Sequence, residues 1–275
     1  MTVRRRVRLA VTRVGGNAIA PLTGVLRSAK DIDGYTIAAR DGEIGRVETI
    51  YFDDATWTVR YFVVDTSNWL PGRRVLISPL SVEAVDEADM HLRVRLTREQ
   101  VQNSPDIDTA KPISRQHELE YYRYYGFPYY WGGPEELGMA PVPLTTAAAE
   151  VTDAPAEPAG DPHLRSTAEV LRYAIHATDG EIGHVDDVLM DDESWAVRYL
   201  IIDTGNWWPG KQIAIAPEWI ERVSWGDAAV YVTVPGATIK NGPEYDPSQP
   251  FDRAREEQLY DAYDRRRYWD RSDAA

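Results

Sequence analysis

The sequence predicts a mainly β protein made of two small antiparallel β-barrels in tandem, each followed by a short aromatic-rich helix. Three observations predict this fold. The chain repeats itself at a spacing of 138 residues, each copy contains several short strand patterns separated by turn residues, and 43% of the 275 residues are apolar. That length suffices for two domains that each bury a core of their own.

The repeat has no gaps over its best-matching part. Residues 41–82 contain 20 identities to residues 179–220 in 42 positions. The same register continues downstream through the pairs Tyr122/Tyr260, Tyr125/Tyr263 and Trp131/Trp269. A period of this length indicates a duplicated domain rather than a solenoid. We therefore expect two units, at 26–131 and 164–269.

The remaining segments are expected to lie outside the folded units. Residues 132–163 hold six Pro, seven Ala and six acidic residues without Lys or Arg, which predicts a flexible linker. Residues 1–25 form a basic arm with five Arg, which we expect to be disordered; an alternative is that the native protein starts near Val25. Residues 270–275 are expected to form a short tail.

Each unit is predicted to contain six strands and a helix. Aromatic and β-branched residues alternate in short runs between turn residues, as is typical of half-buried strands. In the first unit these runs are Tyr35–Arg40, Ile44–Phe52, Trp57–Val64, Arg73–Ser78, Val82–Val85 and Leu92–Leu96. A closed barrel would leave no exposed strand edge. Tyr and Leu at three- and four-residue spacings then predict helices at Ser114–Tyr125 and Asp252–Arg266.

The phrase Asp-Thr-x-Asn-Trp-x-Pro-Gly-basic occurs once in each unit and connects two predicted strands. Pro followed by Gly suits the two central residues of a type II turn, and Asp and Asn side chains can bond nearby backbone amides. Two interpretations are open: the Trp folds over the barrel as a plug, or it is displayed as an anchor for a partner. The candidate residues are Asp65, Asn68, Trp69, Pro71, Gly72, Asp203, Asn206, Trp207, Trp208, Pro209 and Gly210.

A second candidate interface is the aromatic segment that follows the first barrel. Its helical part is expected to pack on the barrel, and the aromatic residues beyond it exceed what one small domain can cover. The second unit or another chain is the expected partner for this surface. The candidate residues are Tyr121, Tyr125, Tyr129, Tyr130 and Trp131.

Catalytic, metal and cofactor sites are not predicted. Asp53-Asp54 and Asp191-Asp192-Glu193 are interpreted as polar turns, although such carboxylates can also bind Ca²⁺. The five histidines show no metal-ligand spacing, and none recurs at the 138-residue offset. No Gly-rich phosphate loop or nucleophile elbow is present.

Charge and cysteine content narrow the classes of function. The net charge of −14 disfavours general nucleic-acid binding, which depends on clustered Lys and Arg. The absence of Cys excludes disulfides and fits a cytoplasmic location. No apolar run is long enough for a transmembrane helix.

The order DGEIG, FDD, W-x-V-R-Y, D-T-x-N-W-x-P-G-basic and SP or AP resembles the PRC-barrel family. The barrel is similar to the cytoplasmic domain of the photosynthetic reaction centre H subunit and to the C-terminal domain of the ribosome-maturation factor RimM. The whole chain looks closest to stand-alone bacterial proteins with two PRC barrels. The resemblance implies a fold and leaves the function open, because such barrels serve as docking modules in unrelated systems.

The resulting hypothesis is a non-enzymatic scaffold or adaptor that binds a protein partner or self-associates. The resemblance extends it to the assembly or regulation of a membrane electron-transfer complex. Two alternatives stay open: a ribosome or RNA-processing factor resembling RimM, and a sensor of a small ligand or cation at a barrel mouth. We also expect the two Trp-Pro-Gly loops to form a twofold contact between the barrels.

Overall fold

The computed structural model describes residues 22, 24–70, 72–105, 113, 115–128, 163–205 and 211–270. The predicted linker at 132–163 lies outside these ranges, except for His163, and so do the basic residues 4–13. Within these ranges, none of the helices combines the length and apolar character that crossing a bilayer would need.

The first unit contains a six-strand path in the order β5-β4-β3-β2-β7-β6. The pair β2–β7 is parallel and the other neighbours in this path are antiparallel. The strands are β2 (Thr36–Ala39), β3 (Gly42–Asp53), β4 (Thr58–Asp65), β5 (Arg74–Ile77), β6 (Val82–Asp86) and β7 (His91–Val94). All six predicted strands are present.

The second unit repeats this arrangement in the order β12-β11-β10-β9-β14-β13. Its parallel pair is β9–β14, which is equivalent to β2–β7. The strands are β9 (Ala174–Ala177), β10 (Gly180–Asp191), β11 (Val197–Asp203), β12 (Gln212–Ile215), β13 (Ile220–Ser224) and β14 (Ala229–Val232).

Neither path of hydrogen-bonded strands closes on itself, in contrast to the fully closed barrel that the sequence predicts. In the first unit β5 and β6 are joined by the 3-10 helix η1 (Pro79–Ser81), and η2 (Pro217–Trp219) does the same between β12 and β13. Each begins with a Pro, which has no backbone N–H to donate to a neighbouring strand. The chain therefore changes direction at each 3-10 helix. A closed barrel would need hydrogen-bonded pairing to continue at this point.

Two of the helices are long enough to cover a sheet face, and they agree with the sequence prediction. They are α3 (Arg115–Tyr125) and α6 (Arg253–Ala262). In β4, Tyr61 and Val63 pack with Tyr121 and Tyr122 of α3, whereas Phe62 and Val64 belong to the main core. This split follows from the alternation of side chains along a strand. The short helices within the described ranges are α1 (Ala29–Ile32), α2 (Arg98–Gln102), α4 (Thr167–Val170) and α5 (Gly236–Asn241).

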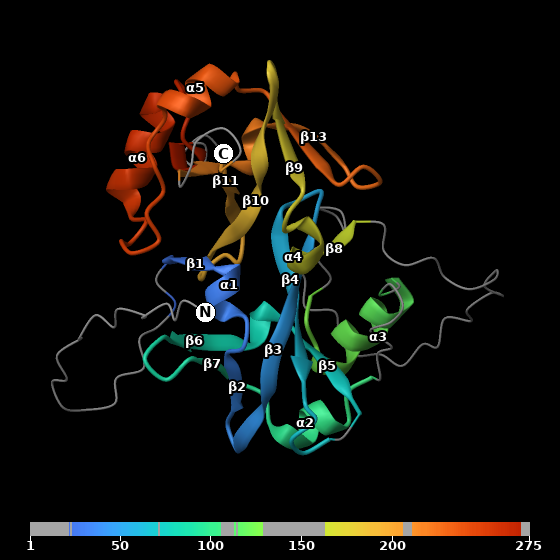
Figure 1. Ribbon diagram of the computed structural model, residues 1–275. Helices are drawn as coiled ribbons and strands as arrows, with labels where there is room; N and C mark the ends of the chain where they lie inside the picture. The colour runs from blue at the N-terminus through green and yellow to red at the C-terminus, as the bar shows by residue number, and fades with distance from the viewer. Residues whose placement is uncertain are drawn as a thin grey trace, which may run out of the picture.

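The two units exchange their first strands, which the sequence patterns do not predict. Strand β1 (Leu26–Ser28) pairs with β10 of the second unit, and β8 (Leu164–Ser166) pairs with β3 of the first. In Figure 1 the blue β1 accordingly lies against the half built from β9 to β14, and the yellow β8 lies toward the other half. Ser28 lies opposite Leu189 and Ser166 lies opposite Tyr51. These pairs are equivalent at the 138-residue offset, so the exchange is reciprocal.

A single hydrophobic core runs through both units as a result. The main cluster of buried residues includes Ile37, Ile50 and Phe62 of the first unit together with Ile175 and Ile201 of the second. We therefore describe the molecule as one body with an approximate twofold relation between its halves.

Candidate functional site

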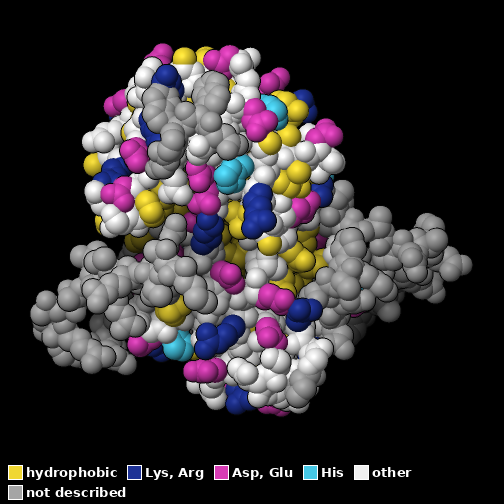
Figure 2. Space-filling model, in the orientation of Figure 1, with side chains coloured by type: hydrophobic (Ala, Val, Ile, Leu, Met, Phe, Trp, Pro, Cys, Tyr) yellow, Lys and Arg dark blue, Asp and Glu magenta, His cyan; other side chains and the backbone are white. Residues whose placement is uncertain are grey.

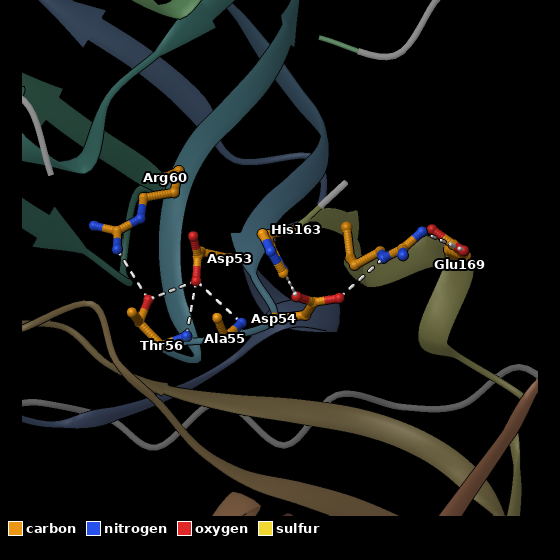
Figure 3. Close-up of polar contacts among 8 residues, drawn as sticks. Asp53, Asp54, Ala55, Thr56, Arg60, His163 and Glu169 are labelled. Atoms are coloured by element: carbon orange, nitrogen blue, oxygen red, sulfur yellow. Dashed lines mark hydrogen bonds and ion pairs between the residues drawn. The ribbon is translucent and has the colours of Figure 1, made fainter. Parts of the chain in front are cut away.

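Each exchanged strand is held by an aspartate that follows the long central strand of the other unit. In the first unit this residue is Asp54, whose backbone N–H donates to the His163 carbonyl at 2.8 Å. The Asp54 carboxylate lies 2.9 Å from His163 Nδ1 (Figure 3). It also accepts from Arg165 Nε at 3.2 Å. Because His163 and Arg165 flank the first residue of β8, this carboxylate clamps the exchanged strand.

Asp192 is the equivalent clamp in the second unit. Its backbone N–H donates to the Val25 carbonyl at 3.0 Å, and its carboxylate accepts from the Val25 N–H at 2.9 Å. Arg27 donates to the same carboxylate at 2.8 Å. The Asp192 side chain is 1% exposed and that of Arg27 is 14% exposed, whereas the Asp54 side chain is 11% exposed. The second clamp is thus the more deeply buried of the two.

The clamping arginines have different second partners. Arg27 forms an ion pair with Glu87, and Arg165 lies over the ring of Trp225, 4.2 Å from its centroid. Glu87 and Trp225 are equivalent at the 138-residue offset. Aromatic rings and carboxylates both attract a guanidinium group. The same position of the repeat therefore holds the clamping arginine by an ion pair in one unit and by a cation–π contact in the other.

Asp53 and Asp191, which precede the clamps, shape the turns. Asp53 Oδ1 accepts from the backbone N–H groups of Ala55 and Thr56 at 3.1 and 2.7 Å, as Figure 3 shows. Asp191 accepts from the Ser194 N–H at 2.7 Å. These contacts agree with the interpretation as polar turns. Within the described ranges, no group of three or more His, Asp or Glu side chains is arranged to hold a metal ion.

Each turn ends in a tryptophan with a left-handed backbone. The φ angles are 53° at Trp57 and 56° at Trp195, a region that bulky residues rarely adopt. The Val197 N–H donates to the Trp57 carbonyl at 2.7 Å, and the Val59 N–H donates to the Trp195 carbonyl at 2.8 Å. The two strained residues therefore hydrogen-bond across the junction between the units, and these bonds help to hold their conformation.

A buried Tyr–Glu hydrogen bond attaches each long helix to its sheet. The hydroxyl of Tyr61 on β4 donates to Glu118 of α3 at 2.8 Å, and the hydroxyl of Tyr199 on β11 donates to Glu256 of α6 at 2.7 Å. Tyr268 also contacts the Glu256 carboxylate, at 3.0 Å. Burial raises the pKa of Glu256 above its ordinary value of 4.5, while Tyr199, Arg253 and Tyr268 oppose that rise. Burial likewise raises the pKa of Tyr199, so this phenol stays protonated and donates.

The raised pKa of Glu256 predicts a pH effect on stability. A carboxyl group whose pKa is higher in the folded than in the unfolded state favours folding in its protonated form, and this contribution is lost as the pH rises above 4.5. We expect the wild-type chain to lose free energy of unfolding relative to a Glu256→Gln variant over that rise. Urea unfolding across the pH range measures the difference, with the half-exposed Glu257→Gln as control. A constant difference would contradict the assignment.

The first tryptophan loop, which follows β4, is closed by side chains of its own residues. Asp65 accepts from the Ser67 N–H at 2.9 Å, and the Thr66 hydroxyl donates to the Arg73 carbonyl at 2.7 Å. Gly72 has a φ of 76°, which agrees with the predicted need for glycine there. Asn68 is exposed, and Pro71 lies outside the described residues.

Trp69 lies half-buried against its own unit. Its indole N–H donates to the Ile44 carbonyl, and the guanidinium of Arg98 lies over the ring, 4.3 Å from the centroid. In the described residues, strand exchange and the Trp57 and Trp195 carbonyls join the two units. The twofold contact expected between the two loops would also involve residues 206–210, which lie outside the described residues, so it stays a prediction. The loop leaves β4 at Asp65, whereas the bridge between the units involves Thr58 at the start of the strand.

In the second loop the structure describes only the closing residues. Asp203 accepts from the Gly205 N–H at 2.8 Å, and the Thr204 hydroxyl donates to the Lys211 carbonyl at 2.9 Å. Both loops thus use the same Asp and Thr contacts. The remaining candidates lie outside the described residues: Asn206, Trp207, Trp208, Pro209 and Gly210.

The described part of the aromatic segment after the first sheet packs mainly against that sheet. Tyr121 is 2% exposed and accepts from the Ser78 N–H at 2.8 Å, and Tyr125 is partly buried against the same cluster. Tyr124 is 42% exposed, although its hydroxyl donates to the Gln100 carbonyl at 2.9 Å. The further candidates Tyr129, Tyr130 and Trp131 lie outside the described residues.

Local sequence patterns do not predict the residues that join the units, although the repeat contains a signal for them. Leu-Arg-Ser occurs at both 26–28 and 164–166, and the buried pair Tyr61 and Glu118 recurs as Tyr199 and Glu256. Polar residues that stay identical between two diverged copies indicate shared contacts. The repeat does not reveal that the contacts of the first strand cross between the copies.

Comparison with known proteins gives one result about the family. The model of the PRC-barrel domain matches residues 25–101 and 169–239, which together make up more than half of the chain. No curated protein matches the chain. The two matched segments contain the equivalent sheets described above, including the residues that carry the resemblance in sequence. The chain therefore belongs to the PRC-barrel family and contains two PRC-barrel domains in tandem.

Proposed function

We propose that the chain is a non-enzymatic scaffold that binds a protein partner through its two PRC-barrel units, 26–131 and 164–269. The observation that carries this proposal is the reciprocal exchange of β1 and β8. An exchange of this kind fixes the relative orientation of two recognition units. A partner that contacts both units then meets a preorganised surface, which lowers the entropic cost of binding.

The use of polar groups at the junction supports a scaffold. Asp54 and Asp192 hold the exchanged strands, and Glu256 holds α6. PRC-barrel domains are generally interaction modules. A framework in which buried carboxylates hold strands and a helix in fixed positions suits that role. The candidate surfaces for a partner are those expected from the sequence: the tryptophan loops at 65–72 and 203–210 and the aromatic residues that follow α3.

The identity of the partner is a finer part of the proposal. By resemblance to the reaction centre H subunit, we infer a subunit or assembly intermediate of a membrane electron-transfer complex. An RNA partner has less support, since acidic and basic side chains are interspersed over the described residues of the face in Figure 2. Non-specific binding to RNA depends on clustered cations.

Affinity capture with the intact chain tests the proposal. We expect a protein to be captured from native extract and to bind the purified chain directly. A Trp69→Ala/Trp207→Ala/Trp208→Ala variant should bind this protein at least about tenfold more weakly, because tryptophans at the centre of an interface contribute most of its energy. Leu80→Ala is the control, since Leu80 is an exposed hydrophobic residue elsewhere on the first unit.

Three outcomes would contradict the proposal. The first is the absence of any direct protein partner, and the second is capture of RNA alone with an affinity that falls steeply with salt. The third is turnover of a substrate by the purified chain that is lost on mutating a described residue. Melting curves of the variants must match that of the wild-type chain, so that lost binding reflects the loop and not unfolding.

A further inference from the structure

The first tryptophan loop lies over a groove of about 330 Å³ whose lining residues include Arg46, Trp69 and Arg98. Arg46 is on β3 and Arg98 is the first residue of α2. The groove thus brings two guanidinium groups and an indole ring together from three parts of the first unit. This set of groups favours a ligand with negative charge next to an apolar group.

The indole ring and one of the guanidinium groups are held in place before any ligand arrives. The Trp69 N–H is bonded to the Ile44 carbonyl, and Arg98 lies over the ring. The Arg98 backbone N–H donates to the Asp41 carboxylate at 2.8 Å. A Cβ atom on Gly42 would lie 3.2 Å from Arg98 Cδ, so the arginine side chain also packs against this glycine. A fixed side chain loses little entropy on binding.

Arg46 and Arg98 lack a carboxylate partner in the described part of the chain. The charged groups nearest along the strands are engaged elsewhere: Asp65, opposite Arg46, accepts from Ser67. Glu43 also lines the groove; its side chain is 72% exposed and lies 3.6 Å from His91, with which it forms an ion pair only when that imidazole is protonated. By contrast, Arg40 and Arg74 of the same unit pair with glutamates.

The second unit has no equivalent pair of cations. At the 138-residue offset Arg46 corresponds to His184 and Arg98 corresponds to Gly236. The scaffold framework, with its clamps and Tyr–Glu bonds, is present in both units, but these two arginines are not. The two arginines occur in one unit alone and take no part in the contacts that hold the units together. This favours a role in recognising a ligand.

We propose that this groove binds an acidic peptide segment of a protein partner. Carboxylates of the peptide pair with the guanidinium groups of Arg46 and Arg98, and a neighbouring apolar side chain contacts the half-buried ring of Trp69. A short peptide confines its negative charge to the groove, whereas a long nucleic acid would also meet the acidic surface of a chain with a net charge of −14. This inference rests on the proposed function and adds the chemistry of the partner.

The test uses the full chain and a fluorescein-labelled dodecapeptide of alternating Glu and Ser with one central Leu. We expect fluorescence anisotropy to show binding at about 50 mM salt, where charge interactions are weakly screened. An Arg46→Gln/Arg98→Gln variant should bind at least about tenfold more weakly, since charge-assisted hydrogen bonds are lost. Arg40→Gln/Arg74→Gln is the matched control, because it removes two exposed arginines of the same unit, and its affinity should change less than about twofold.

A second readout locates the peptide on the protein. The indole N–H signal of Trp69 in a nitrogen-15 correlation spectrum, assigned with Trp69→Phe, should shift on addition of the peptide. The inference is overturned if a peptide with Gln at every Glu binds equally well, if the control variant loses as much affinity, or if the labelled peptide does not bind. Tighter binding of a single-stranded DNA of equal charge would also overturn it.

Failure of this inference is distinguishable from failure of the proposed function. If the tryptophan-loop variant loses a captured protein but the Arg46→Gln/Arg98→Gln variant retains it, the scaffold stands and the acidic-peptide site is wrong. If no protein partner binds the chain directly, the proposed function fails whatever the peptide does.

Discussion

A Thr49→Cys/Ser166→Cys variant is expected to form an intrachain disulfide on mild oxidation. The hydroxyl oxygens of these two side chains lie 2.8 Å apart, on β3 of the first unit and β8 of the second. Cysteine sulfurs at the same positions come within reach of a bond of about 2.05 Å. Because the natural chain has no Cys, the engineered pair is the only one that can form.

Oxidation should stabilise the variant substantially. The bond would close a loop between positions 117 residues apart, which restricts the unfolded chain. Chain-entropy arguments give up to about 4–5 kcal/mol for a loop near this length, and engineered bonds commonly deliver less. We expect a gain of about 2–4 kcal/mol in the free energy of unfolding, measured by urea titration of the oxidised against the reduced variant.

A matched variant distinguishes the exchanged from an unexchanged arrangement. If each first strand paired within its own unit, Ser28 would occupy the place of Ser166 beside Thr49. Ser28 instead contacts Asp187 of the second unit at 2.5 Å. Ser28→Cys/Thr49→Cys should therefore not form an intrachain bond. Rapid crosslinking of this control, with none in Thr49→Cys/Ser166→Cys, would show that the strands are not exchanged.

Asp192→Ala is expected to cost about 3–5 kcal/mol of folding free energy, the range observed when one member of a buried ion pair is removed. The carboxylate is almost fully buried and accepts from the Val25 N–H and from Arg27. Among the described residues, its removal leaves the largely buried Arg27 guanidinium group with Glu87 as its one ion-pair partner. The edge of the exchanged strand β1 also loses a backbone contact.

Asp54→Ala is the matched comparison, because it removes the equivalent clamp in the other unit. We expect a smaller loss of about 1–3 kcal/mol, since the Arg165 and His163 side chains are 25% and 54% exposed and water replaces part of the contact. Urea unfolding of both variants at neutral pH measures the two losses. Equal losses, or a larger loss for Asp54→Ala, would contradict the role assigned to burial at the second clamp.

The sequence accounts for most of the fold within each unit. Alternating side chains in runs such as Trp57–Val64 predict strands because the pattern has the period of an extended chain. The repeat predicts two equivalent units, since two copies with 20 identities in 42 positions cannot adopt different folds without losing a shared core. The helices α3 and α6 follow from the spacing of Tyr and Leu.

The candidate site is less accessible to sequence reasoning. The loop contacts of Asp65 and Gly72 are local and follow from turn chemistry. The packing of Arg98 on Trp69 joins residues 29 positions apart, and no local pattern predicts it. The clamp between Asp192 and Arg27 joins residues 165 positions apart, and it depends on which sheet receives β1.

The sequence by itself determined the strands, the two units, the turn residues and the aromatic helices, because each of these follows from patterns within a few residues of one another. Only the tertiary structure decided that β1 and β8 change places. Strands β3 and β10 are identical at only six of their twelve positions, yet each receives the same Leu-Arg-Ser segment, so local sequence does not distinguish the two edges. Local periodicity describes what a strand edge can bind, but the choice between two equivalent edges depends on packing in three dimensions.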